Sequence, residues 1–200
     1  MNADLIRNME RRNFLVHTAA NAEEAKAIAL SLIGKRSVGI GGSKTAKQLG
    51  LYDTLTGQGN EVHWHWMVDK AHKQEERDRA IRCEVYLASA NALLEDGRIV
   101  EIDGTGNRVA GILYGPPYVI LIVGNQKVCP DFDSAIARIK RDACPENARR
   151  LGKKTPCAAT GICADCRTQE RMCNATVLIE WPLRIHKEFH VILVDEPLGL

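Results

Sequence analysis

The sequence has few aromatic residues and no long apolar run. Only 5 % of its 200 residues are aromatic, and the longest uninterrupted apolar stretch is 118–123. Such a stretch is far too short to cross a bilayer, so we expect no membrane span. The N-terminus carries scattered charges between Asp4 and Arg12 and lacks the apolar core of a signal peptide, which predicts a cytoplasmic protein.

A strong charge of either sign is also missing. The 27 basic and 25 acidic side chains give a net charge of +2, so the sequence shows no electrostatic footprint for nucleic acid. It also lacks a nucleophile elbow, a Ser–His–Asp order and a kinase signature. We therefore expect no nucleic-acid partner, and the sequence leaves open whether the chain is an enzyme.

Cysteine, in contrast, is concentrated. Four of the seven cysteines lie between Cys157 and Cys173, with the spacing C-x5-C-x2-C-x6-C. In a reducing cytosol, clustered cysteines are more often metal ligands than disulfides or buried thiols. One close pair flanked by single cysteines suits a [4Fe-4S] cluster at least as well as zinc, so both remain open. The expected metal ligands are Cys157, Cys163, Cys166 and Cys173, and we interpret Cys83, Cys129 and Cys144 as small buried apolar residues.

Strand and helix patterns alternate along the chain. The stretch 118–123 is apolar on both faces, which is typical of a strand inside a covered parallel sheet. The alternation predicts a three-layer α/β fold with a mostly parallel sheet. The cysteine-rich loop, at about 155–174, interrupts the alternation as an insertion packed against the sheet. Expected helices are 21–33, 46–49, 70–82, 106–113 and 131–142, and expected strands are 37–40, 61–66, 85–88, 98–102, 118–123, 177–180 and 190–194.

Two loops carry candidate ligand-binding residues. The first, 41–45, follows a strand and opens a helix, so its amides and hydroxyls could bind an anion; a tight turn with a serine cap is the alternative. The second, 89–108, gathers acids, amides and one guanidinium that could form a site or could hold two loops together. The candidates are Gly42, Ser43, Thr45, Asn91, Glu95, Asp96, Asp103, Gly104, Gly106, Asn107 and Arg108.

A pair of histidines has no clear third metal ligand. His63 and His65 share one face of an expected strand, and Trp64 and Trp66 share the other. An exposed edge strand explains this pattern better than a metal site does. The role of the two histidines stays open.

Several of these motifs together resemble the LUD domain of lactate-utilisation proteins, the LutC or YkgG group. The motifs are Gly42-Ser43-x-Thr45, Ser89-Ala-Asn91-Ala, the string from Ile102 to Val109, Tyr114-Gly-Pro116, and 145–157. The resemblance implies one LUD-like domain over 1–200, with a fold similar to the NagB/RpiA/CoA-transferase-like class. It also implies a link to oxidation of lactate to pyruvate by an iron–sulfur-containing system. Relatives tend to have Gly-x-Asn-Lys where this chain has 124–127, which leaves the role of Lys127 open.

Three functions follow as hypotheses. The favoured one is an iron–sulfur redox component of lactate or small hydroxy-acid utilisation, which binds an anionic small molecule and works with protein partners or as a homo-oligomer. The second is a NagB/CoA-transferase-like binding protein or enzyme with a structural zinc. The third is an assembly or regulatory subunit.

Overall fold

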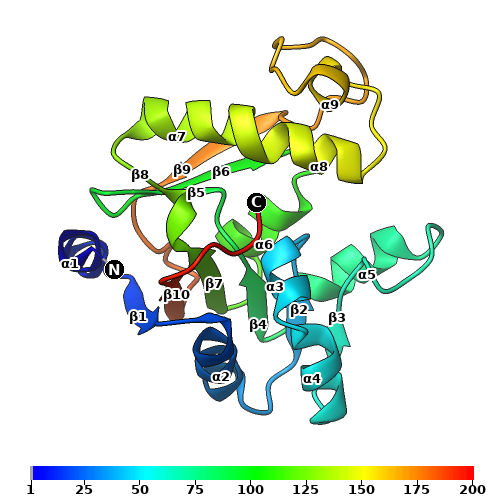
Figure 1. Cartoon of the computed structure of the whole chain (residues 1–200). Coiled ribbons are helices and arrows are strands. Elements are labelled where there is room, and N and C mark those ends of the chain that lie inside the picture. The colour runs from blue at the N-terminus through cyan, green and yellow to red at the C-terminus, as the bar shows by residue number, and fades with distance from the viewer. Residues whose placement is uncertain (1) are drawn as a thin grey trace.

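A parallel sheet of six strands runs through the middle of the molecule (Figure 1). The computed structural model describes residues 2–200. Every neighbouring pair of strands in this sheet is parallel, so all the carboxyl ends meet at one edge, where α/β proteins bind ligands. In spatial order the strands are β1 (Leu15–Ala19), β10 (Glu188–Val194), β7 (Tyr118–Gly124), β4 (Val85–Ala88), β2 (Val38–Ile40) and β3 (Val62–His63).

The central strand β7 is buried on both faces. Ile120 and Ile122 pack into the core on one side of the sheet, and Val119 and Leu121 pack into the core on the other side. The expectation of a covered strand at 118–123 is confirmed. Burying four branched side chains stabilises this strand by roughly 1.5–3 kcal/mol for each side chain, which makes β7 a rigid support for the loop that follows it.

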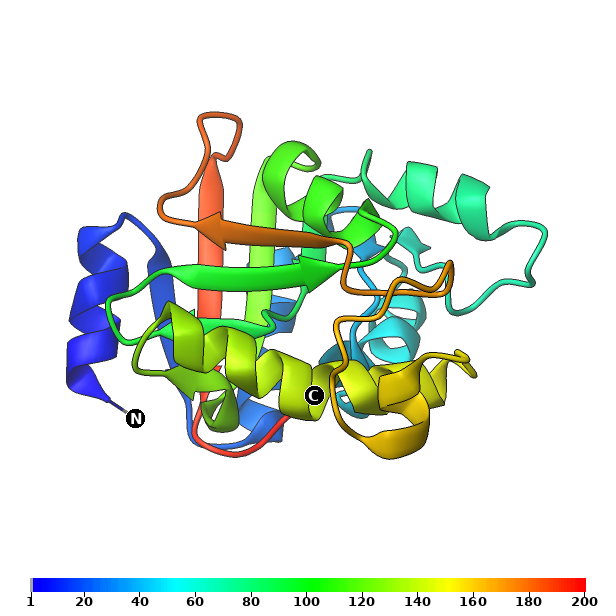
Figure 2. The same ribbon diagram turned by 90° about the horizontal axis from the view of Figure 1, so that it is seen from above.

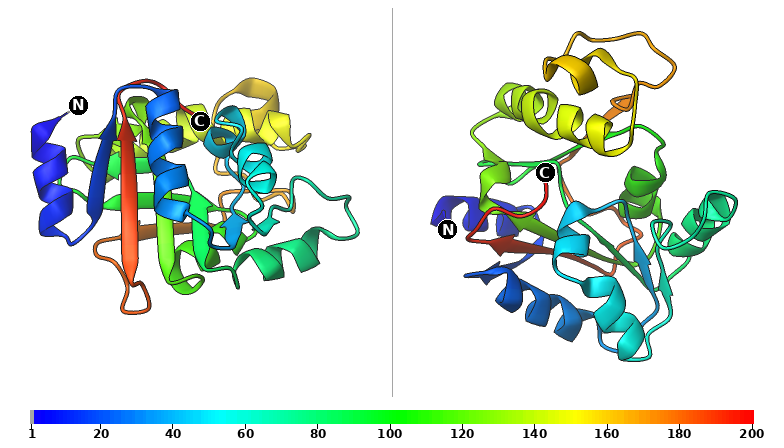
Figure 3. Two further views of the ribbon diagram at one scale, coloured as in Figure 1. Left: turned by 90° about the horizontal axis from the view of Figure 1, so that it is seen from below. Right: turned by 45° about the vertical axis from the view of Figure 1, so that its right-hand side comes forward.

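Helices cover both faces of the sheet. One face is covered by three helices that contribute Ala25, Ile33, Ala46, Leu51 and Leu55 to the core (Figure 3). Asn21 begins the longest of them, because its side chain accepts a hydrogen bond from the Glu24 amide. On this face lie α2 (Ala22–Ile33), α3 (Lys44–Gln48) and α4 (Leu51–Gly57); the remaining helices of the first half are α1 (Ala3–Arg11), α5 (Lys73–Ala80) and α6 (Asn107–Tyr114).

A second sheet lies across the opposite face, with its strands crossing those of the parallel sheet (Figure 2). Leu93 packs toward the parallel sheet, whereas Leu94 packs into a third core cluster with Ala135 and Ile139. The strands expected at 98–102 and 177–180 are present, but we expected them in the same sheet as the others. Instead they pair antiparallel with each other in this separate sheet. Its strands are β8 (Val128–Cys129), β5 (Ala92–Leu94), β6 (Ile99–Asp103) and β9 (Ala175–Ile179).

A long helical stretch covers the second sheet and leads into the cysteine-rich insertion. It consists of α7 (Phe132–Arg138), a π-helical segment η2 (Ile139–Ala143) and α8 (Cys144–Arg150). We call residues 155–174 the cysteine segment; it contains the short helix α9 (Pro156–Thr160) and projects from the end of α8 (Figure 1). The expected three-layer α/β sandwich with a cysteine-rich insertion is confirmed. Within residues 2–200, no helix has the length and apolar character needed to cross a membrane.

One expected strand is shorter than its pattern suggested. Only Val62 and His63 of the stretch 61–66 pair with β2. The chain then leaves the sheet because the Trp64 indole turns inward and donates a hydrogen bond to the Gly41 carbonyl, 3.0 Å away. Trp64 and Trp66 stack with ring centroids 5.1 Å apart.

Candidate functional site

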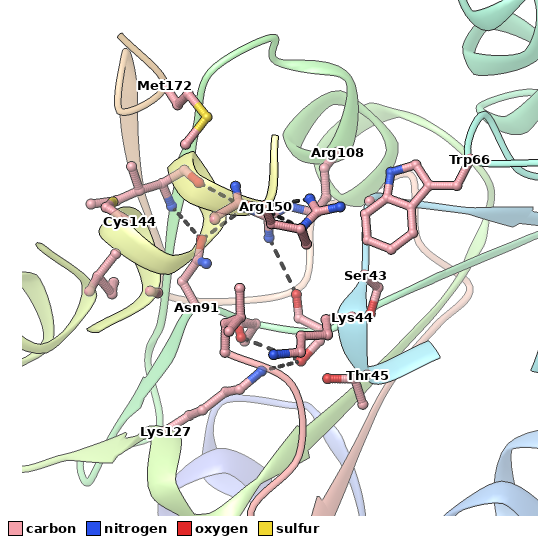
Figure 4. A pocket seen from close by; sticks show the side chains of 18 residues that line it. Ser43, Lys44, Thr45, Trp66, Asn91, Arg108, Lys127, Cys144, Arg150 and Met172 are labelled. Atoms are coloured by element: carbon pink, nitrogen blue, oxygen red, sulfur yellow. Dashed lines mark hydrogen bonds between the residues drawn. The ribbon is translucent and has the colours of Figure 1, made fainter. Parts of the chain in front are cut away.

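A pocket opens where three strands of the parallel sheet end, beneath helix α8 (Figure 4). The loops 42–45, 89–91 and 125–127 follow β2, β4 and β7, and each contributes to its wall. We call this the central pocket; its cavity volume is about 100 Å³. Drug-sized ligands and cofactors occupy roughly 300–1,000 Å³, so the central pocket has room for a molecule of a few heavy atoms.

The wall of the central pocket is basic. Lys44, Arg108, Lys127 and Arg150 line it, and no Asp or Glu among residues 2–200 does so. In a partly enclosed site, charges interact more strongly than they do in water. Because Arg108 pairs with Glu101 and Lys44 pairs with Glu146, the positive charge that the central pocket offers to an anion comes chiefly from Arg150.

The loop after β2 contributes as expected. Gly42, Ser43 and Thr45 all line the central pocket. The Ser43 hydroxyl accepts a hydrogen bond from the Ala46 amide at 3.1 Å and so caps α3, which is the structural role that the sequence left open. The Thr45 hydroxyl, in contrast, is buried without a hydrogen-bond partner among the described residues, and it remains able to bind a ligand.

Arg108 is held by the protein itself. Its side chain is 11 % exposed and forms an ion pair with Glu101, which is fully buried. It also donates to the Asn91 side chain at 2.8 Å and to the Ile102 carbonyl at 2.8 Å. Burial raises the pKa of the Glu101 carboxyl, and Arg108 opposes that rise. Arg108 and Asn91 therefore support the wall of the central pocket. Most N–H groups of the guanidinium already donate to protein acceptors and are not free to bind a ligand.

The turn from β6 into α6 is organised by Asp103. Its carboxylate accepts hydrogen bonds from the amides of Thr105, Gly106 and Val109 at 3.0, 2.9 and 3.2 Å. Gly106 has a φ of +89°, which favours glycine. Asp103 thus caps α6, and it faces a second cavity rather than the central pocket.

This second cavity adjoins the central pocket and shares several walls with it. Its volume is about 380 Å³, and Asp103, Gly104 and Asn107 lie on its wall. The guanidinium carbon of Arg150 lies 4.4 Å from the centre of the Trp66 ring, and both residues line both cavities. We call it the outer cavity; it gives the central pocket a polar approach.

His65 also lines the outer cavity, whereas His63 points elsewhere. Burial, together with the nearby charges of Arg77 and Lys73, lowers the pKa of His65 to about 4, so the ring is neutral at neutral pH. His63 contacts Glu61 and Glu76 at 2.9 and 3.1 Å on the edge of the sheet. The two histidines therefore do not form a joint site.

Glu95 and Asp96 do not belong to the ligand edge, which corrects the sequence-based expectation. They form the turn between β5 and β6, at the end of this hairpin that lies away from the central pocket. There the Glu95 carbonyl accepts a hydrogen bond from Asn8 at 2.8 Å, and the Asp96 carboxylate pairs with Arg98 at 2.7 Å. In a β-hairpin the turn lies at one end of the two strands, and the chain enters and leaves at the other end. This turn is therefore remote from the central pocket.

Lys127 is the most unusual side chain of the central pocket. It ends the 3-10 turn η1 (Asn125–Lys127) after β7 and is only 2 % exposed. Its amine donates a hydrogen bond to the Ser89 hydroxyl at 2.9 Å. Burial and, to a smaller extent, the positive charges of Arg138 and Arg108 together lower the pKa of Lys127 to about 7, although Glu101 opposes this shift. A large fraction of this amine is therefore uncharged at neutral pH.

The cysteine segment meets the central pocket at one side. Met172 lines the pocket, next to Cys173 in the chain. Arg171 holds this part of the segment together, because it pairs with Asp165 at 2.8 Å and donates to the carbonyls of Cys166 and Cys173 at 2.8 and 3.1 Å. All four expected ligands are free, partly exposed thiols. As they stand, residues 2–200 contain no group of three His, Cys, Asp or Glu side chains close enough to hold a metal ion.

A fifth cysteine lies beside the segment. Cys144 begins α8 and lines the central pocket. Burial raises the pKa of the Cys144 thiol to about 12, and the nearby thiols of Cys173, Cys157 and Cys163 add to this rise. Cys144 therefore lies within electrostatic range of these three thiols, next to the central pocket, although no three of the described cysteines converge on one point.

Sequence reasoning missed several members of the site. Cys144 was interpreted as packing only, Arg150 lay only within the family motif at 145–157, and Glu101 and Lys44 were not singled out. A signal for Lys127 was present, because a lysine close behind a strand that is buried on both faces must lie at the ligand edge of the sheet. No comparable signal marks Arg150, whose position depends on how α8 packs.

Comparison with known proteins identifies the family and the fold of the chain. The family model of the LUD domain matches residues 3–194. A crystal structure of a DUF162 family protein from Deinococcus radiodurans is similar in fold, with a TM-score of 0.53 and 17 % sequence identity; the match covers 96 % of this chain and 97 % of that chain. Among curated proteins, none matches the sequence. With nearly its whole length matched by the family model, the chain belongs to the LUD domain family.

Proposed function

We propose that this LUD-domain protein is an iron–sulfur redox component of lactate or small hydroxy-acid utilisation. In this proposal the central pocket binds the small carboxylate, and Cys157, Cys163, Cys166 and Cys173 hold the cluster. The observation that carries it is a shared wall: Met172 of the cysteine segment lines the small pocket together with Cys144, and Met172 directly precedes Cys173 in the chain.

The central pocket suits a three-carbon acid. Its volume of about 100 Å³ and the positive charge of Arg150 favour a compact anion. Thr45 offers an unpartnered buried hydroxyl, and Lys127 offers a buried amine. A hydroxyl or carbonyl next to a carboxylate could bind to these two groups, because buried donors and acceptors gain most from a partner.

The donors of the cysteine segment fit an iron–sulfur cluster chemically. All four thiols are free, and such clusters are held by four thiolates. Arg149, Arg150, Lys153 and Lys154 lie at the end of α8 and would offset the negative charge of four thiolates. When bound, a [4Fe-4S] cluster supplies one-electron transfer.

The proposal includes a partner and a compartment. One-electron transfer needs a protein that exchanges electrons with this one, and the cysteine segment offers an exposed surface, where Ile162 is 72 % exposed. Seven free cysteines suit a reducing compartment, so we place the protein in the cytoplasm.

Anaerobic purification tests the proposal directly. Iron and acid-labile sulfide analysis should give a cluster in a brown protein that bleaches in air. Calorimetry of the same sample should detect binding of lactate or pyruvate. Iron-free protein, or an iron-loaded protein that binds neither acid, would contradict the corresponding half of the proposal.

A structural zinc in a small-molecule-binding protein is the second candidate. It is favoured by the way in which the cysteine segment is tied to the body of the protein, since Asn174 donates to the Gly104 carbonyl at 2.9 Å and Arg149 to the Ala158 carbonyl at 2.8 Å. A segment fixed in this way could use a metal purely for folding. Colourless protein with one zinc for each chain and intact acid binding would establish this candidate.

A further inference from the structure

Lys127 has a chemical character that the proposed redox function does not use. It is a buried amine on the wall of the central pocket, and lysines in desolvated surroundings near other cations can act as nucleophiles. We propose that Lys127 is a catalytic residue whose amine forms a Schiff base with the carbonyl carbon of a small α-keto acid. This inference rests on the ligand class of the proposed function, a small carboxylate, and does not depend on the metal.

The position of the Lys127 amine supports this role. Figure 4 shows the side chain reaching into the central pocket near Thr45, with the amine bonded to the Ser89 hydroxyl. A Cβ atom added to Gly199 would collide with the Thr45 hydroxyl and lie 3.0 Å from the Lys127 amine. The Lys127 amine and the unpartnered Thr45 hydroxyl therefore lie close together beside Gly199, and both residues line the central pocket.

The surroundings keep the amine reactive. A Schiff base forms only from the uncharged amine, and burial with Arg138 and Arg108 nearby lowers the pKa of Lys127 to about 7. Glu101 acts in the opposite direction, but it is engaged by Arg108 in an ion pair. A lysine placed here only for packing would instead be expected to pair with a carboxylate, and the hydrogen bond recorded for the Lys127 amine is to a neutral serine.

The chemistry balances without an oxidant. The amine attacks the carbonyl carbon, a C–N bond forms, and the carbonyl oxygen takes up a proton to give a carbinolamine. The C–O bond then breaks and the hydroxyl leaves as water, with its second proton taken either from the nitrogen, which gives a neutral imine, or from solvent, which leaves the nitrogen protonated as an iminium. Ser89 accepts a hydrogen bond from the amine and is placed to pass a proton between nitrogen and oxygen.

Borohydride trapping with pyruvate is the test. Reduction converts an imine into a stable secondary amine, so protein treated with pyruvate and borohydride should carry one adduct, which peptide mass mapping should locate on Lys127. Lactate, which has no carbonyl, should give none. Lys127→Met and Lys127→Arg should abolish the adduct, whereas Lys47→Met, which removes an exposed lysine of α3 outside the central pocket, should keep it on Lys127.

The outcomes separate the two proposals. Pyruvate binding in calorimetry without an adduct on wild-type Lys127 would overturn this inference and leave the proposed ligand class intact. Absence of both binding and adduct would overturn the ligand class and the inference together. Adducts spread over surface lysines, unchanged in Lys127→Arg, would also overturn the inference.

Discussion

At the residue scale, the ion pair between Arg108 and Glu101 is the most deeply buried ion pair among the described residues. Glu101 is fully buried, so removing its partner leaves an uncompensated buried carboxylate. We expect Arg108→Ala to lower the free energy of unfolding by about 3–5 kcal/mol, measured by denaturant titration. The more exposed Arg98–Asp96 pair is the matched control, and Arg98→Ala should cost below about 1 kcal/mol.

The opposite pattern would change the role of Arg108. If Arg108→Ala left the free energy of unfolding nearly unchanged but abolished pyruvate binding, the guanidinium would be a ligand contact rather than a support. The four hydrogen bonds that it donates to protein acceptors argue for the support.

Lys127 should give stability a distinctive pH dependence. The unfolded chain keeps this proton up to the ordinary pKa of 10.5, whereas the folded protein loses it near 7. Between these values the unfolded state binds more protons, so stability rises with pH, by about 1.4 kcal/mol for each pH unit. Below 7 the cost of the buried charge is fully present. Lys127→Met should therefore gain most stability below pH 7, and this gain should shrink as pH rises toward 10.5.

Denaturant titrations of wild type and Lys127→Met across this pH range check the prediction. Taking the difference between the two proteins removes the contribution of other titrating groups. A difference that stays constant from pH 6 to pH 10, within about 0.5 kcal/mol, would mean that Lys127 titrates alike in both states and is charged in the fold.

At the element scale, the sequence predicts what depends on local pattern. The helix expected at 21–33 is α2, with Asn21 as its cap, and the apolar stretch 118–123 is β7. The second sheet could not be foreseen, because β5 has three residues and β8 has two, too few for periodicity to show. Pairing between β6 and β9 joins residues far apart in sequence, and only tertiary packing decides it.

The cysteine segment allows a prediction about single thiols. Changing any of Cys157, Cys163, Cys166 or Cys173 to serine should release metal and loosen the segment, because ligation and local folding are coupled. Metal analysis and limited proteolysis measure the two effects. Cys83→Ala, in a buried site away from the segment, should keep the metal.

Cys144 makes this test sharper, because it lies near three of these thiols. With the four ligands as proposed, Cys144→Ala should also keep the metal. Loss of metal in Cys144→Ala together with full metal in Cys166→Ser would exchange the two cysteines in the ligand set. Full metal in two or more of the four serine variants would contradict the set as a whole.

At the scale of the whole molecule, the site joins segments that the sequence keeps far apart. Sequence reasoning found the loops at 42–45 and 89–108, because both follow strands of the parallel sheet. It placed Glu95 and Asp96 wrongly, because a turn between antiparallel strands carries the same residue types as a ligand loop. The contribution of α8 was out of reach, since it depends on how the layers stack.

Gly104 is the point where the cysteine segment touches the body of the protein most closely. A Cβ atom there would lie 2.6 Å from the Met172 carbonyl oxygen, so Gly104→Ala must push the segment away. We expect this variant to weaken both metal retention and pyruvate binding, measured by metal analysis and calorimetry. Gly57→Ala is the control, because a Cβ atom at Gly57 meets nothing within 4 Å. Loss of one property alone would show that the two sites are independent.

The same contact has a thermodynamic consequence. Met172 forms part of the wall of the central pocket. If metal binding to the cysteine segment moves Met172, it changes the affinity of the pocket for the acid by some factor. Linkage requires the acid to change the affinity for the metal by the same factor. Protein that has lost its metal would then give a systematically different affinity for pyruvate, and added pyruvate would alter the rate at which metal is lost to a chelator.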